Sequence, residues 1–169
     1  MIQKKVCMVG LFATGKTSLV QRFVHSHFSE RYLSTVGVKI DRKEVEVDGA
    51  AVTLLLWDLA GRDGFEDITP SYLRGSHGIL FVADGTRRDT WEQLGALRDL
   101  ARDAAGDVPS VLALNKMDLT DQWALDRGDE KKLAGEWDLV RTSAKTGEGV
   151  EEVFRRLGRG TLAQKEANR

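Results

Sequence analysis

Short apolar runs alternate with amphipathic stretches along the chain, an order typical of a parallel sheet covered by helices. The runs expected to form parallel strands span residues 6–9, 52–57, 79–83, 111–114 and 139–142. Several are continuously apolar, as strands buried on both faces are. Residues 38–47 differ because they alternate and lead through Asp48-Gly49, a hairpin signal, into the next run. We therefore predict a mostly parallel six-stranded sheet with one antiparallel edge strand.

Apolar residues recurring every three or four positions predict helices between these strands. Helices are expected over residues 15–25, 91–104 and 150–162, with a short one around 130–135. Thr90 is the expected N-cap of the second helix. Together with the strands they predict a single α/β domain over residues 1–169, built as a three-layer sandwich.

Composition excludes several classes of protein. Lys and Arg number 25 and Asp and Glu 26, for a net charge of −1, so no basic surface for nucleic acid or anionic lipid is expected. The apolar runs are shorter than the roughly 20 residues of a membrane span, and the start of the chain is too short for a signal peptide. A single cysteine, Cys7, lies in a buried strand, which favours a reducing, cytoplasmic location. We expect a monomer.

Residues 10–17, Gly-Leu-Phe-Ala-Thr-Gly-Lys-Thr, match a phosphate-binding loop between a strand and a helix. Their backbone N–H groups can point at phosphate oxygens, Lys16 can neutralise the outer phosphates, and the Thr17 hydroxyl can bind Mg²⁺. The residues expected around the phosphates are Ala13, Thr14, Gly15, Lys16, Thr17 and Ser18. The alternative is an ordinary glycine-containing turn. The pattern indicates a nucleoside triphosphate without specifying the base.

Asn115-Lys116-Met117-Asp118 follows the strand at 111–114, at the edge of the sheet where α/β proteins bind ligands. A carboxylate there can accept hydrogen bonds from N1–H and the 2-amino group of guanine, whereas adenine would leave it unpaired. Ser143-Ala144-Lys145 follows the next strand and could close over the base, with the Ala144 N–H directed at the guanine carbonyl. Taken alone, the first motif could be only a polar turn.

Asp58-Leu59-Ala60-Gly61 ends the strand at 52–57. The Asp58 carboxylate can bind Mg²⁺ through water, and the Gly61 N–H can approach the terminal phosphate. Thr35 is available as a second hydroxyl ligand for Mg²⁺. Both features have plain alternatives, a strand-terminating turn and an ordinary loop threonine.

With these motifs in this order, the chain resembles a Ras-superfamily small GTPase over residues 4–162. It is most similar to the Rab branch, by residues 34–38, 57–61 and 72–78, and to prokaryotic Rab-like or Ras-like members. The resemblance implies a P-loop NTPase fold that binds GTP and GDP with Mg²⁺ held by Thr17, Thr35 and Asp58. It implies switch loops at 29–38 and 61–73, and Phe28 stacked on guanine, with a core residue as the alternative for Phe28.

The chain departs from the family at the position after Gly61, where Arg62 replaces the usual glutamine. A guanidinium has only donors, so it cannot accept a hydrogen bond from the attacking water. It could instead stabilise charge on the γ-phosphate, or be a solvent-exposed loop residue. Phe12 adds bulk beside the γ-phosphate. We expect Lys16, the Thr35 carbonyl and Arg62 to form the catalytic set, with slow hydrolysis.

No cysteine follows Cys7, so we expect no lipid anchor in this chain, either because it stays soluble or because a tail is missing. Two other functions stay open. One is a non-hydrolysing pseudo-GTPase that acts as an interaction module. The other is a P-loop kinase, which the missing arginine-rich lid insertion argues against. The sequence specifies no effector, exchange factor or activating protein.

Overall fold

The computed structural model describes residues 2–11, 13–25, 38–59 and 70–167. The strands are β1 (Ile2–Val9), β2 (Val38–Val47), β3 (Ala50–Leu59), β4 (Gly78–Asp84), β5 (Ser110–Asn115) and β6 (Leu139–Arg141). They form a six-stranded sheet in the order β2-β3-β1-β4-β5-β6. Among the strands of the described residues only β2 and β3 pair antiparallel, and β2 lies at the edge, so the predicted sheet is confirmed.

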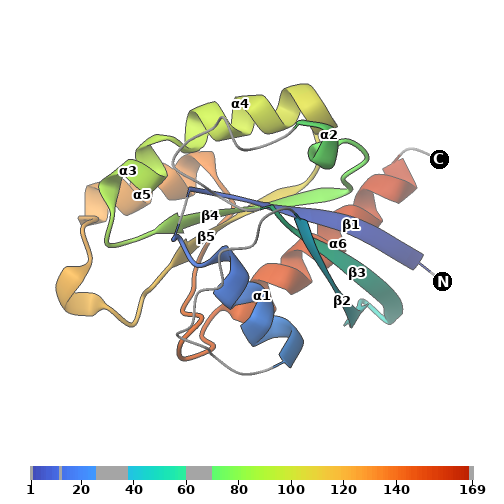
Figure 1. The fold of residues 1–169 in the computed structure, drawn as a ribbon, viewed down its shortest axis with the longest axis horizontal. Coiled ribbons are helices and arrows are strands. Elements are labelled where there is room, and N and C mark those ends of the chain that lie inside the picture. Colours follow the sequence, from blue (N-terminus) through green and yellow to red (C-terminus); the bar gives the residue numbers. More distant parts are fainter. Residues whose placement is uncertain (1, 12, 26–37, 60–69, 168–169) are drawn as a thin grey trace.

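Helices cover both faces of this sheet (Figure 1). They are α1 (Lys16–His25), α2 (Pro70–Leu73), α3 (Arg88–Glu92), α4 (Leu94–Ala105), α5 (Arg127–Glu136) and α6 (Val150–Ala167), with a 3₁₀ turn, η2 (Thr120–Gln122). The helices α1 and α6 pack on one face, and α2 to α5 pack on the other. The three-layer prediction is therefore confirmed.

The predicted helix over 91–104 is wrong at its start. The chain forms two helices, α3 and α4, separated at Gln93, and the N-cap of α3 is Arg87. Thr90 lies inside α3 and is fully buried. Its hydroxyl accepts from the Asp84 N–H and donates to the Arg87 carbonyl instead of capping the helix. Two other helices are longer than expected, α5 because a capping box at Asp126 starts it early and α6 because it runs on to Ala167.

Each face of the sheet has its own hydrophobic core. On one face, Phe23 of α1 and Phe154 of α6 stack with ring centroids 4.0 Å apart. On the other, Phe81 of β4 meets the ring of Trp137 edge to face, with centroids 5.0 Å apart. Because consecutive side chains of a strand point to opposite faces, the buried strands supply both cores and read as unbroken apolar runs.

Across the part of the chain that the structure describes, no helix combines the length and the apolar character needed to span a bilayer.

Candidate nucleotide-binding site

Three strand ends place the predicted motifs at one edge of the sheet. The loop of residues 10–17, here called the phosphate loop, follows β1, and Asp58 and Asn115 stand at the ends of β3 and β5. Because β1, β3 and β5 run parallel, their carboxyl ends lie at the same edge. Ligands of open α/β sheets bind in the crevice at this edge.

The phosphate loop has a shape that few sequences allow. Its backbone takes positive φ at Ala13 (62°) and at Gly15 (102°), and the second value strongly favours glycine. A Cβ on Gly10 would lie 2.5 Å from the Val82 carbonyl oxygen, so glycine is needed there too. The Thr14 hydroxyl donates to the Leu11 carbonyl at 2.9 Å and closes the loop. The loop therefore wraps tightly and leads into the first turn of α1.

Lys16 is the first residue of α1 and carries its charge inside the site. It is buried, and its Nζ donates to the Gly10 carbonyl at 3.1 Å. Burial lowers the pKa of Lys16 to about 8, although the nearby Asp58 carboxylate acts in the opposite direction. A buried ammonium would gain from negatively charged phosphate oxygens, and the N-terminal end of α1 also favours an anion.

Thr17 and Asp58 form the part of the site suited to a cation. The Thr17 hydroxyl donates to Asp58 Oδ2 at 2.5 Å. Asp58 is buried, and its other carboxylate oxygen, Oδ1, has no hydrogen-bond partner among the described residues. Burial raises the pKa of this carboxyl group above its usual value. A hydroxyl oxygen and a desolvated carboxylate oxygen side by side fit the oxygen ligands that Mg²⁺ prefers.

Asn115 ties the phosphate loop to the neighbouring strands. Its Nδ2 donates to the Thr14 carbonyl at 3.0 Å, and its Oδ1 accepts from the Thr142 hydroxyl at 3.0 Å. A Cβ on Gly15 would lie 2.2 Å from that Nδ2, so this contact exists because position 15 has no side chain. Asn115 therefore joins the phosphate loop to the loop that follows β6.

Asp118 is positioned by a serine of the following loop. The Ser143 hydroxyl donates to Asp118 Oδ1 at 2.7 Å and accepts from the Thr146 N–H at 3.0 Å. The Met117 N–H donates to the Thr142 carbonyl at 3.0 Å, so the two loops are joined through their backbones as well. The structure brings together the two motifs that the sequence assigned to the base.

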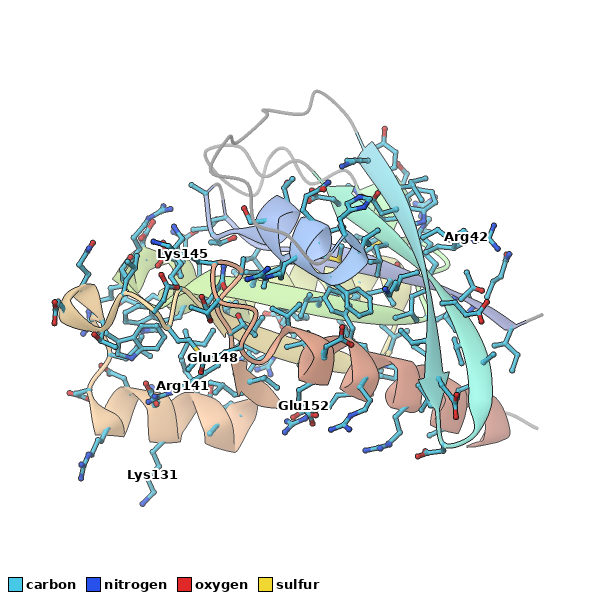
Figure 2. All side chains as sticks on the ribbon, turned by 90° about the horizontal axis from the view of Figure 1, so that it is seen from below. Arg42, Lys131, Arg141, Lys145, Glu148 and Glu152 are labelled. Carbon is cyan, nitrogen blue, oxygen red and sulfur yellow. The ribbon has the colours of Figure 1, made fainter. Side chains whose placement is uncertain are left out.

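The rest of the second loop lies against α1. Ala144 is buried, whereas Lys145 is exposed. Arg22 of α1 donates to the Lys145 carbonyl at 2.6 Å, a contact that the sequence analysis did not anticipate. In Figure 2 the loop that carries Lys145 and Glu148 runs beside α1.

Part of the predicted site falls on residues that the structure does not describe. These are Phe12, Phe28, Thr35, Gly61 and Arg62, together with most of the predicted switch loops. Ser18 is described and lies in the first turn of α1. Sequence analysis missed Asp84, whose carboxylate pairs with Lys116, with Asp84 Oδ2 2.8 Å from Lys116 Nζ. The sequence did carry a signal for Asp84, because it is an acidic residue directly after the apolar run at 79–83.

Comparison with known proteins agrees with this geometry. The family model described as Ras family matches residues 5–163. The chain is 35% identical over 156 residues to the Ras-related protein Rab-1C of Dictyostelium discoideum, which covers 90% of this chain and 78% of that protein. It is 36% identical over 154 residues to the Ras-related protein Rab-1 of Theileria annulata, covering 89% of this chain and 70% of that protein. The Theileria parva Rab-1 protein is 35% identical over 154 residues, with the same coverage of 89% and 70%.

Proposed function

The chain belongs to the Ras family, within its Rab branch, and is a GTP-binding switch; we propose that it binds its nucleotide with Mg²⁺ and hydrolyses GTP slowly. The observation that carries the proposal is the Thr17–Asp58 pair, because it leaves one buried carboxylate oxygen without a partner among the described residues, beside the buried Lys16. The same pair favours bound Mg²⁺ over a bare nucleotide.

In this proposal the residues of the phosphate loop bind the β- and γ-phosphates. The N–H groups of Ala13 and Gly15 and the ammonium of Lys16 would stabilise the negative charge that builds on the leaving β-phosphate oxygen as its bond to the γ-phosphorus breaks. Thr17, Asp58 and Thr35 would hold Mg²⁺, which supplies further positive charge at the phosphate oxygens.

The base is selected by Asp118 and by the loop after β6. The Asp118 carboxylate accepts from N1–H and the 2-amino group of guanine, the Ala144 N–H donates to the guanine carbonyl, and Phe28 stacks on the ring. Ser143 keeps one Asp118 oxygen in place. Adenine offers no donor to the carboxylate, so its binding would leave a desolvated charge unpaired.

The γ-phosphate is also proposed to order the switch loops at 29–38 and 61–73, which in the GTP state then present a surface to a partner protein. The Thr35 carbonyl holds the attacking water. Arg62 is proposed to slow the reaction, because a guanidinium has no acceptor for that water's proton. Phe12 is proposed to crowd the γ-phosphate further.

The proposal is tested by single-turnover hydrolysis of preloaded GTP in the presence of Mg²⁺. We expect slow conversion to GDP by the wild type and conversion about 10-fold faster or more by Arg62→Gln, because the amide can accept from the water. Arg102→Gln, a change of the same kind on the surface of α4, serves as the control and should match the wild type.

Three outcomes would contradict parts of the proposal. Wild-type hydrolysis at least as fast as that of Arg62→Gln would mean that Arg62 assists the reaction. GTP that stays unchanged in every variant would mean that the protein does not hydrolyse it. GDP release that is the same with Mg²⁺ and with excess chelator would exclude the proposed magnesium ion.

A further inference from the structure

A buried carboxylate lies beside the site without belonging to any of its motifs. Asp84, the last residue of β4, is fully buried. Its Oδ2 lies 2.8 Å from Lys116 Nζ. Its Oδ1 accepts from the Thr86 N–H at 2.8 Å and from the Thr86 hydroxyl at 2.7 Å. Burying a carboxylate is costly unless it is paired and hydrogen-bonded, and this one is both.

The backbone that carries Asp84 is fixed as well. The Asp84 N–H donates to the Thr90 hydroxyl at 2.9 Å, and that hydroxyl donates to the Arg87 carbonyl at 2.7 Å. The next residue, Gly85, donates its N–H to the Asn115 carbonyl at 3.0 Å. The carboxylate is therefore a rigid anchor connected to both β5 and α3.

Lys116 connects this anchor to the phosphate loop. Besides its ion pair with Asp84, Lys116 Nζ donates to the Ala13 carbonyl at 2.9 Å. Both Lys116 and Ala13 have positive φ, 70° and 62°, which is unfavourable for residues with a side chain. The pair with Asp84 gives the same ammonium a second, buried partner, which restricts where Lys116 Nζ can lie relative to the Ala13 carbonyl.

We propose that Asp84 is a positioning residue for nucleotide retention. This role rests on the proposed function, and Asp84 fills it through Lys116. The carboxylate keeps the lysine extended across the site, and the lysine binds the Ala13 carbonyl. The phosphate loop therefore stays closed around the nucleotide. Asp84 itself touches neither base nor phosphate in this role. Weakening the anchor should speed the release of guanine nucleotide.

The variant that isolates the pair is Asp84→Asn. Its amide oxygen can accept both Thr86 bonds, which leaves an amide NH₂ facing the Lys116 ammonium, donor against donor. The matched control is Thr86→Val, which removes one hydrogen bond to Asp84 and keeps the ion pair. The assay is the release of a fluorescent GDP from preloaded protein in excess unlabelled GDP with Mg²⁺. We expect release about 10- to 100-fold faster from Asp84→Asn and within about 3-fold of wild type from Thr86→Val.

Two further measurements separate positioning from a general loss of structure. The ratio of the release rates of GDP and inosine diphosphate should stay at its wild-type value, because Asp118 still selects the base. In a Lys116→Met background, Asp84→Asn should accelerate release no further, because the residue through which it acts is gone. If Asp84→Asn has no cooperative thermal transition, Asp84→Ser tests the same pair with a smaller polar side chain.

The release assay distinguishes a wrong role for Asp84 from a wrong proposed function. Wild-type protein that does not retain guanine nucleotide would overturn the proposed function. Wild-type protein that retains it, with release from Asp84→Asn at the wild-type rate, would overturn the inference alone. Equal acceleration with and without Lys116, or a changed ratio of GDP to inosine diphosphate release, would also overturn it.

Discussion

Replacing Gly15 by alanine tests how the phosphate loop depends on one missing side chain. Gly15 has φ of 102°, and a Cβ at this position would lie 2.2 Å from Asn115 Nδ2. Alanine therefore meets two penalties, a backbone conformation that L residues avoid and a collision with a buried amide. The loop can accept the methyl group only if Asn115 moves.

The size of the effect follows from these contacts. The backbone strain is worth about 1–2 kcal/mol. A displaced Asn115 loses its bonds to the Thr14 carbonyl and the Thr142 hydroxyl, at about 1 kcal/mol each. Alanine also restricts the unfolded chain, which offsets about 1 kcal/mol of the loss. We expect the free energy of unfolding to fall by about 2–3 kcal/mol, and nucleotide affinity to fall with it.

Urea unfolding of the nucleotide-free protein measures this loss. With a slope of about 2 kcal/mol per molar urea, the midpoint should drop by about 1–1.5 M. Gly95→Ala is the control, because Gly95 lies in α4 with no positive φ and nothing within 4 Å of its added Cβ. That variant should be as stable as the wild type or slightly more so. Equal midpoints for Gly15→Ala and Gly95→Ala would refute the reasoning.

Three further predictions concern charge, specificity and packing. Burial lowers the pKa of Lys16 to about 8, so between about pH 8 and 10.5 the unfolded chain binds a proton that the folded protein lacks. As the pH rises through that range, the free energy of unfolding of the nucleotide-free wild type should increase by up to about 3 kcal/mol relative to Lys16→Met. A difference between the two proteins that stays constant with pH in urea unfolding would contradict this. Asp118→Ala should weaken GDP binding about 100-fold or more in a competition assay, without creating ATP binding, and unchanged GDP affinity would exclude Asp118 from the base site. Phe154→Ala should destabilise the fold by about 3–5 kcal/mol in the same urea assay, because it leaves a cavity against Phe23; a loss below 1 kcal/mol would mean that the site collapses around the gap.

The sequence predicted the sheet well because its signals are local. The alternation over 38–47 and the Asp48-Gly49 turn specify a hairpin by themselves, and β2 has those bounds. The phosphate loop was predictable because its motif lies in one short segment, although the contacts that require its glycines, Gly10 with Val82 and Gly15 with Asn115, come from distant strands. Local patterns also placed Asp118 and Ser143 at neighbouring strand ends.

What the sequence could not provide was the choice of hydrogen-bond partner across the fold. The sequence suggested Thr90 as a helix N-cap, which is wrong, and it could not show that the Thr90 hydroxyl bonds Asp84 and Arg87. The pairing of Asp84 with Lys116 joins the last residue of β4 to the residue that follows β5, 32 positions later, and no short pattern encodes it. The roles of Thr35 and Arg62 stay predictions, since both lie outside the described residues.

The strands β1 and β4 belong to both hydrophobic cores, and this has a consequence for how the molecule opens. Val6 and Met8 of β1 face one core, and Cys7 and Val9 face the other. Neither core can lose its packing without exposing the strands that the other core uses, so the two should unfold in a single transition. In native-state hydrogen exchange, the amides of β1 and β4 should be the last to exchange. The phosphate loop extends directly from one of these strands, so its attachment persists through every local opening short of global unfolding.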